Sequence, residues 1–162
     1  MKKKIYFIAL IGILLDQITK IFISNWMSPF TSKIIIKDFF SITYVKNTGG
    51  AWGILNNNLS FLIIVSIIAL LVLNRYIKKE SSINKIMLLS YGFLIGGIFG
   101  NLIDRIVRGY VVDFFHFYIF NYSYPVFNIA DILIVVGIIL MLIEVIRGEI
   151  NEFKSRTKQY KN

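Results

Sequence analysis

The sequence predicts an all-α integral membrane protein with four transmembrane helices, a small extracytoplasmic β-sheet and an interfacial loop or helix. Of its 162 residues, 56% are hydrophobic, and the mean hydropathy of +0.68 is well above that of soluble domains. Four apolar runs approach the roughly 20 residues that a helix needs to cross a bilayer. Between these runs lie two segments whose residue alternation and aromatic content are typical of structures at a membrane surface.

The four apolar runs predict spans at about residues 5–23, 59–76, 86–104 and 126–146. Three lysines precede the first run, as in a secretory signal peptide, but Asp16 and Lys20 occupy the region where a small-residue cleavage site is expected. We therefore interpret the first run as a retained span. Within the second span, the apolar segment from Leu59 to Leu73 lies in the stretch from Asn47 to Asn74, which contains no charged residue.

Lysine and arginine are unevenly distributed between the two sides of these spans. Twelve of the 18 basic residues lie at the amino terminus, in the last residues of the second span and the connection to the third, or in the tail 147–162, and five lie in segments 24–58 and 105–125. Because cytoplasmic loops retain basic residues, we expect both termini in the cytoplasm and these two segments outside it. Anionic lipid headgroups then explain the net charge of +9 without a nucleic-acid partner.

Residues 1–162 are expected to form one membrane domain and to be monomeric.

The two outward segments differ in character. Residues from Ser41 to Lys46 alternate polar and apolar side chains, which predicts a short strand, and a turn-rich run with Gly49, Gly50 and Gly53 follows. Residues 110–127 include many aromatic side chains, which are typical of the membrane interface. We expect a small extracytoplasmic sheet from the first segment and an interfacial loop or helix from the second.

The available side chains limit the chemistry. Cysteine is absent and His116 is the only histidine, so a disulfide and a thiolate nucleophile are excluded and we expect no metal and no cofactor. Asp113 and Asp131 lie at the edges of hydrophobic segments. Ionisable groups at membrane depth are costly and seldom retained for stability, which makes both aspartates candidates for function. Two such carboxyl groups close together would share a proton.

Other polar residues accompany these aspartates on the expected helices. The groups that share one helix face are Asp16 with Lys20, Asn101 with Asp104 and Arg105, and Asn128 with Asp131. In the expected topology, all of them fall at the outer leaflet or just above it. Pro125 breaks the chain before the fourth span and lets it turn back toward Asp113. We therefore expect one polar pocket at the outer leaflet.

Five motifs occur in these elements. They are residues 16–20 (DQITK), 47–53 (NTGGAWG), 100–105 (GNLIDR), 111–114 (VVDF) and 127–131 (FNIAD). In order and spacing they resemble signal peptidase II, the bacterial lipoprotein signal peptidase, and the resemblance extends from the first span to the fourth. It implies an aspartyl endopeptidase of the bacterial cytoplasmic membrane. Such an enzyme removes signal peptides from diacylglyceryl-modified prolipoproteins, cutting on the amino side of the lipidated cysteine.

The resemblance also implies roles for individual residues. Asp113 and Asp131 would be the catalytic dyad. One carboxylate takes a proton from water, while the other carboxyl group is protonated and donates its proton or a hydrogen bond to the carbonyl oxygen. The substrate-binding and supporting residues would be Asp16, Lys20, Asn47, Gly49, Trp52, Asn101, Arg105 and Asn128. Trp52 has two interpretations, a hydrophobic flap over the site or an interfacial anchor. The partners would be lipid-modified prolipoproteins and membrane lipids, with the site toward the outer leaflet.

Other interpretations of the same residues stay open at this point. A small ion- or proton-coupled transporter could use Asp16, Asp113 and Asp131 as a relay, although relay carboxylates are expected through the membrane depth rather than toward one side. Asp131 could merely favour the start of its helix. Asp16 with Lys20 is also typical of a satisfied intramembrane pair, and Asp104 ranks as structural.

Overall fold

The computed structural model describes residues 2–50, 58–120 and 122–159. In chain order, the elements in these ranges are α1 (Lys2–Trp26), β1 (Ser32–Ile36), β2 (Phe40–Asn47), α2 (Leu59–Lys79), α3 (Lys85–Val107), β3 (Val111–Ile119), β4 (Tyr122–Ser123) and α4 (Ile129–Gln159). Each of these four helices is long and apolar enough to cross a membrane, α4 over Ile129–Asn151. The prediction of a mostly helical membrane protein with four spans and a small sheet is confirmed.

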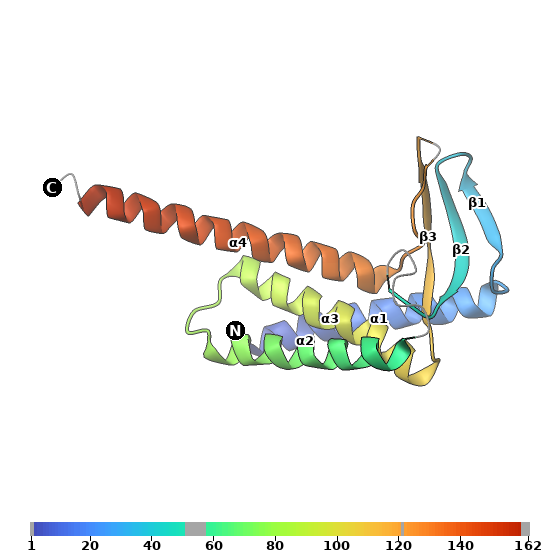
Figure 1. Ribbon diagram of the computed structural model, residues 1–162, viewed down its shortest axis with the longest axis horizontal. Helices are drawn as coiled ribbons and strands as arrows, with labels where there is room; N and C mark the ends of the chain where they lie inside the picture. The colour runs from blue at the N-terminus through green and yellow to red at the C-terminus, as the bar shows by residue number, and fades with distance from the viewer. Residues whose placement is uncertain (1, 51–57, 121, 160–162) are drawn as a thin grey trace.

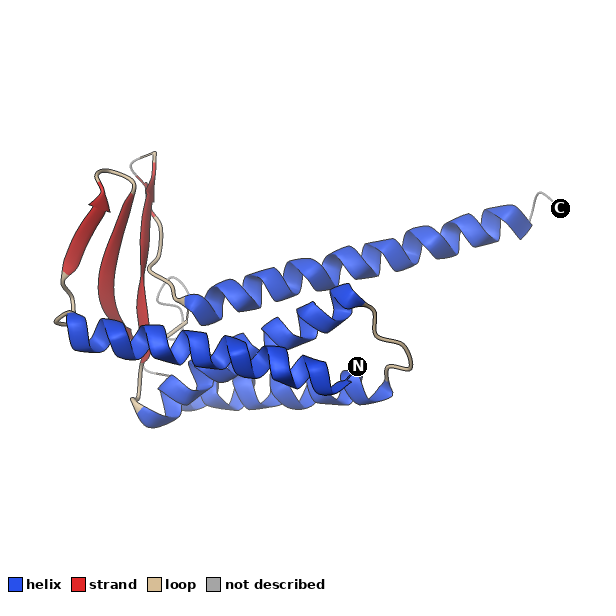
Figure 2. Cartoon of the chain, turned by 180° about the vertical axis from the view of Figure 1, so that it is seen from behind, coloured by secondary structure: helices blue, strands red, loops and turns tan. Residues whose placement is uncertain are grey.

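The helices lie side by side, and the sheet stands across one end of the bundle (Figure 1). We call this end the sheet end; it comprises β1 to β4 and the adjoining ends of α1, α3 and α4. The beginning of α1 and the final turns of α4 lie toward the opposite side, which we call the connection end because it includes residues 80–84 between α2 and α3 (Figures 1 and 2). α3 is the central helix, since it packs against α1, α2 and α4.

Small residues let α3 approach its neighbours closely. A Cβ atom at Gly97 would overlap the backbone oxygen of Ala130, and one at Gly100 would lie 2.5 Å from Asp16 Oδ2. Both positions therefore require glycine, as is common where helix backbones meet in a membrane. The close approach places the carboxylate of Asp16 where α1, α3 and α4 meet.

The sheet has the strand order β1-β2-β3-β4, and neighbouring strands are antiparallel. The strand predicted at residues 41–46 is confirmed as part of β2. Segment 105–125, expected as an interfacial loop or helix, contains β3 and β4 instead, and Asp113 lies on β3 opposite Val45. Both faces of β3 carry apolar or aromatic residues, so no alternation of polar and apolar side chains reveals this strand. Its pairing with β2 defines it.

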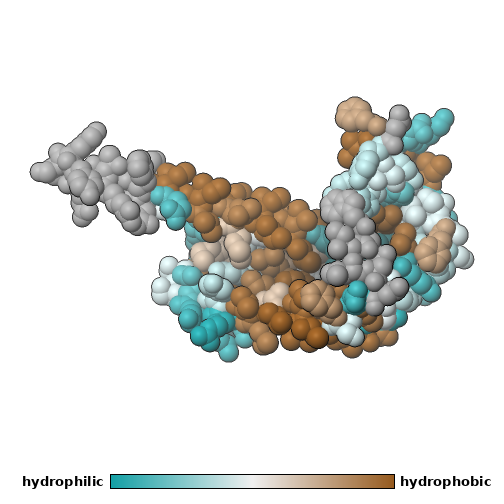
Figure 3. Space-filling view, viewed as in Figure 1, coloured by the Kyte–Doolittle hydropathy of each residue, from teal (hydrophilic) through white to brown (hydrophobic). Residues whose placement is uncertain are grey.

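Two apolar clusters hold the fold together. The cluster at the connection end consists of Ile5, Ala9, Ile77, Ile83, Tyr91 and Ile95. The cluster at the sheet end consists of Ile23 of α1, Met27 directly after α1, Tyr44 of β2, and Val112 and Phe114 of β3. This second cluster fastens β3 to α1 and thereby helps to position Asp113. The outer faces of the helices are apolar and exposed, brown in Figure 3, as expected for contact with lipid.

Candidate active site

Asp113 on β3 and Asp131 in the first turn of α4 are held by one residue, Asn128. The side-chain amide of Asn128 donates to Asp113 Oδ1 at 2.6 Å, and its backbone N–H donates to Asp131 Oδ2 at 3.1 Å. In return, Asn128 Oδ1 accepts from the backbone N–H of Asp131 at 3.0 Å, which gives the reciprocal pattern of a capping box. Asn128 is fully buried, so the two carboxyl groups meet around a single fixed residue.

Each carboxylate also accepts from a second asparagine. Asn47 of β2 donates to Asp113 Oδ2 at 2.8 Å, and Asn101 of α3 donates to Asp131 Oδ1 at 2.7 Å. Among the described residues, each of the four carboxylate oxygens therefore accepts one hydrogen bond. A carboxylate oxygen has two lone-pair positions, so a second acceptor position on each can serve water or substrate.

The surroundings of Asp113 favour its protonated form. Burial and then the negative charge of Asp131 raise the pKa of Asp113 to about 7, against the opposing effect of its asparagine donors and of Lys20. Two carboxyl groups in this arrangement titrate as a pair and retain one proton between them near neutral pH. The pair can thus offer one proton acceptor and one proton donor at the same time.

An open cavity of about 420 Å³ lies against the two aspartates. Its polar lining includes Asn47, Asn101, Arg105, Asp113 and Asp131, and its apolar lining includes Val126, Phe127, Ile132, Val135 and Val136. The last three residues belong to α4 and follow Asp131 along the membrane-spanning helix. The cavity thus joins a carboxyl pair to an apolar wall, which suits an extended chain with an apolar portion.

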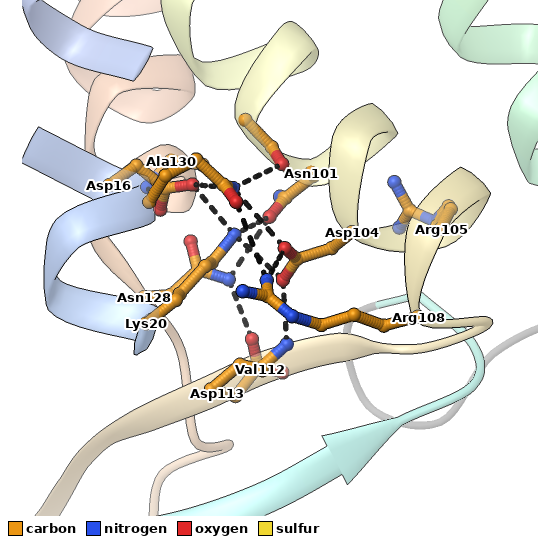
Figure 4. Close-up of polar contacts among 12 residues, drawn as sticks. Asp16, Lys20, Asn101, Asp104, Arg105, Arg108, Val112, Asp113, Asn128 and Ala130 are labelled. Carbon is orange, nitrogen blue, oxygen red and sulfur yellow. Dashed lines mark hydrogen bonds and ion pairs between the residues drawn. The ribbon is translucent and has the colours of Figure 1, made fainter. Parts of the chain in front are cut away.

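Lys20 does not line the cavity but lies in the buried polar cluster next to it, which Figure 4 shows. Its Nζ lies 2.8 Å from Asp16 Oδ2 and 3.3 Å from Asp104 Oδ2, and it donates to Asn101 Oδ1 at 2.9 Å. Lys20 and both of these aspartates are fully buried. Three acceptors thus face the three donors of the ammonium, which offsets the desolvation of the charge.

The family of this chain follows from comparison with known proteins. The sequence model of signal peptidase (SPase) II matches residues 8–147. The chain belongs to the signal peptidase II family. It is also similar to two solved bacterial membrane enzymes. One is 38% identical with a TM-score of 0.83, covering 90% of this chain and 88% of that one. The other is 39% identical with a TM-score of 0.77, covering 86% and 90%.

Membership in the signal peptidase II family identifies the activity of this chain. The family consists of aspartic peptidases of the bacterial membrane that cleave signal peptides from lipoprotein precursors. The predicted membrane aspartyl endopeptidase is therefore confirmed, as are lipoprotein precursors as its substrate class, and a proton-coupled transporter is not favoured.

The structure brings most of the sequence-predicted site residues of this peptidase together. Nine of the predicted residues line the cavity or belong to the buried polar cluster around Lys20. They are Asp16, Lys20, Asn47, Gly49, Asn101, Arg105, Asn128, Asp113 and Asp131. Arg105 Nη2 lies 3.5 Å from the backbone oxygen of Gly49, and its buried Nε has no hydrogen-bond partner among the described residues. The guanidinium thus keeps donors available at the cavity. Trp52, which the sequence left open as either a flap or an interfacial anchor, lies outside the described residues.

Three polar residues play larger parts than the sequence indicated. Gln17 Nε2 donates to Asp104 Oδ1 at 3.2 Å, and Arg108 forms an ion pair with the same carboxylate. Asp104, ranked as structural, also accepts from the backbone N–H of Val112 at 3.0 Å, directly before Asp113. The spacing of four residues between Asp104 and Arg108 could have indicated their ion pair. No local pattern indicates that Asp104 reaches β3.

Proposed function

We propose that Asp113 and Asp131 are the catalytic dyad with which this signal peptidase II hydrolyses the peptide bond of a lipoprotein precursor. The observation that supports this most strongly is that Asn128 donates to a carboxyl oxygen of each aspartate, beside a cavity that both of them line. The raised pKa of Asp113 adds support, because a dyad needs one protonated and one ionised carboxyl group at working pH.

Two carboxyl groups and one water can carry the reaction. The ionised carboxylate takes a proton from the attacking water as the water oxygen bonds to the scissile carbonyl carbon, and the protonated carboxyl group donates its proton to the carbonyl oxygen. When the C–N bond then breaks, the leaving nitrogen takes the proton that came from water. The proton on the former carbonyl oxygen returns to the other carboxylate, so the dyad ends with one proton, as it began.

The neighbouring side chains would orient the dyad and the substrate. Asn47, Asn101 and Asn128 hold the carboxyl groups, so that the remaining lone pairs can face water and the scissile bond. The free donors of Arg105, beside the turn at Gly49, suit carbonyl oxygens of an extended substrate backbone. Asn47 Oδ1 accepts from the Gly49 N–H at 2.9 Å, which stabilises this turn.

The substrate would lie partly in the bilayer. We infer that the signal peptide follows the apolar wall of Ile132, Val135 and Val136, while the diacylglyceryl group of the modified cysteine stays among lipids of the outer leaflet. Cleavage would occur on the amino side of this cysteine, because lipid burial holds the scissile bond at the depth of the dyad. One chain supplies both aspartates, which supports a monomer as the working unit.

Cleavage of a lipidated precursor peptide by the purified protein in detergent tests the dyad. Asp113→Asn and Asp131→Asn should each lower the rate by about 1,000-fold, within the range of general acid–base contributions. Asp38→Asn is the matched control, because Asp38 is exposed in the β1–β2 turn at φ 57°, a conformation that asparagine accepts. Wild-type cleavage by either dyad variant would refute the assignment.

A second experiment tests the orientation in the membrane. The basic residues predict that the sheet end lies outside the cytoplasm and that both termini lie inside it. The chain has no cysteine, so Asp38→Cys at the sheet end and Ser81→Cys at the connection end can be labelled one at a time in spheroplasts. A membrane-impermeant maleimide should label position 38 alone. Labelling of position 81 alone would reverse the proposed orientation.

A further inference from the structure

Lys20 contacts the side chains that hold both aspartates of the proposed dyad. We propose that Lys20 is a positioning residue for the dyad: its ammonium orients three side chains that fix the backbone and the carboxyl groups of the two catalytic residues. These side chains are Asp16, Asp104 and Asn101. The inference rests on the proposed function, because it takes Asp113 and Asp131 as catalytic.

Two of the three side chains hold backbone N–H groups next to the dyad. Asp16 Oδ1 accepts from the Ala130 N–H at 2.9 Å, one residue before the catalytic aspartate of α4. Asp104 Oδ2 accepts from the Val112 N–H at 3.0 Å, one residue before the catalytic aspartate of β3. The Lys20 ammonium contacts both of these carboxylates. One cation therefore links the two segments that must meet for catalysis.

The third side chain, Asn101, is oriented by donor and acceptor chemistry. An ammonium has no acceptor, so Lys20 must face Asn101 Oδ1, which leaves the NH2 group of Asn101 to donate to Asp131 at 2.7 Å. Asn128 Nδ2 donates to the same Asn101 oxygen at 3.1 Å and to Asp113 at 2.6 Å. Lys20 thereby sets the direction of two amides, both of which donate to the dyad. A reversed amide would turn its oxygen against a carboxylate.

Lys20 also supplies positive charge close to the dyad. The charged groups around the site are Asp16 and Lys20 on α1, Asp104, Arg105 and Arg108 at the end of α3, Asp113 on β3 and Asp131 on α4. The ammonium favours ionised carboxylates and so opposes the burial that raises the pKa of Asp113. Removing this charge should shift the acidic limb of the pH–rate profile to higher pH.

Lys20→Met in the full chain tests the inference, because it keeps an unbranched side chain and removes the ammonium. With the lipidated precursor peptide, kcat should fall on the order of 100-fold with little change in KM, which is typical of misplaced catalytic groups. The acidic limb should move to higher pH. Ser90→Ala is the control, since buried Ser90 joins α3 to α4 away from the site by donating to the Gly137 oxygen at 2.8 Å. It should change thermal stability alone.

A second variant separates positioning from folding, because Lys20→Met leaves buried carboxylates without their cation. Lys20→Met combined with Asp16→Asn removes one charge of each sign, and the asparagine oxygen can still accept from the Ala130 N–H. This double variant should fold, with the same loss of kcat, whereas its acidic limb should move less than that of Lys20→Met, because the opposite charge of Asp16 is removed with that of Lys20. A folded double variant with wild-type kcat, or a folded Lys20→Met with an unmoved acidic limb, would overturn the role of Lys20.

The remaining outcomes are also decisive. A double variant that does not fold would overturn the inference, because Lys20 would then act on folding rather than on the dyad. Failure of the proposed function is recognised separately with Asp113→Asn and Asp131→Asn in the same assay. If these two variants cleave at the wild-type rate, the dyad is wrong. If they are inactive while Lys20→Met is normal, only the role of Lys20 is wrong.

Discussion

The sheet end and the connection end of the bundle are built from different kinds of side chain. The buried polar side chains at the sheet end are Asp16, Lys20, Ser41, Asn101, Asp104, Asp113 and Asn128. Toward the connection end, the described residues include one buried polar side chain, Ser90, close to the apolar cluster of α1, α2 and α3. Because buried charge and polarity lower stability unless they are fully paired, this difference separates the part of the protein organised for chemistry from the part organised for packing.

The difference also shows how the sheet end tolerates its charges. Asp16 and Asp104 are balanced by Lys20 and Arg108, so this set of four is formally neutral. The carboxyl pair in front of it has asparagine donors instead of a full set of cations, and its protonation therefore remains free to change during a reaction. Substitutions at the two ends should accordingly affect different measurements.

The largest expected effect is a loss of cleavage on substitution at the sheet end, compared with a loss of stability on substitution at the connection end. Asp131→Asn should lower kcat by about 1,000-fold and change thermal stability little, because removal of a buried carboxylate offsets the loss of one of the two hydrogen bonds that its oxygens accept. Ile77→Ala, in the fully buried core of the connection end, should lower the free energy of unfolding by about 2 to 5 kcal/mol. The kcat of its folded fraction should stay at the wild-type value. Peptide cleavage measures kcat and thermal unfolding measures stability. Similar effects of the two variants on kcat would contradict the division between a catalytic sheet end and a packing connection end.

A smaller effect compares two glycines of α3. The Cβ atom of Gly100→Ala would lie 2.5 Å from Asp16 Oδ2 and should displace the carboxylate from the start of α4, so we expect kcat to fall about 10- to 100-fold. The Cβ atom of Gly92→Ala would lie 2.6 Å from Ile8 Cγ2, an apolar side chain near the connection end. This variant should lower the thermal midpoint and leave kcat unchanged. Equal losses of kcat would show that both glycines act only through packing.

Asp113 should make stability depend on pH. Its pKa is raised from 3.8 to about 7 by burial, so the folded state binds this proton more tightly than the unfolded state does. The resulting stability is present in full below about pH 4 and is lost as the pH rises toward 7. The thermal midpoint should therefore fall over this interval, and Asp113→Asn should reduce the fall. Ile77→Ala should shift the whole curve without changing its slope, and an unchanged slope in Asp113→Asn would contradict the assignment.

The smallest effect belongs to an ion pair at the connection end. Glu144 lies 3.6 Å from Arg147, whose side chain is 57% exposed, and such pairs contribute about 0 to 1 kcal/mol. Glu144→Gln should leave cleavage and the thermal midpoint nearly unchanged. Asp104→Asn, its counterpart at the sheet end, should lower the free energy of unfolding by about 3 kcal/mol, because it disrupts a fully buried ion pair with Lys20 and a partly exposed one with Arg108. Denaturation of both variants under one condition measures this contrast.

The parts of this fold and site that could be predicted from sequence are those with local patterns. The spans follow from hydropathy, and the strand at residues 41–46 follows from alternation. The grouping of Asn128 with Asp131 follows from helical spacing, and the structure shows these two as a capping box. β3 could not be predicted in the same way, because aromatic residues cover both of its faces. The link from Asp104 to the strand of Asp113 has no local pattern at all.

By itself, the sequence determined that this chain forms four membrane helices with carboxylates and amides gathered toward one side, because hydropathy and helical periodicity act between neighbouring residues. Only the tertiary structure decided which atoms meet. Asn128 donates to both aspartates, and Lys20 contacts the side chains that hold them. One of these side chains, Asp16, accepts from the Ala130 N–H, 114 positions away in the sequence. Such contacts depend on how closely α3 approaches its neighbours at Gly97 and Gly100, and this distance is set by packing between helices rather than within one.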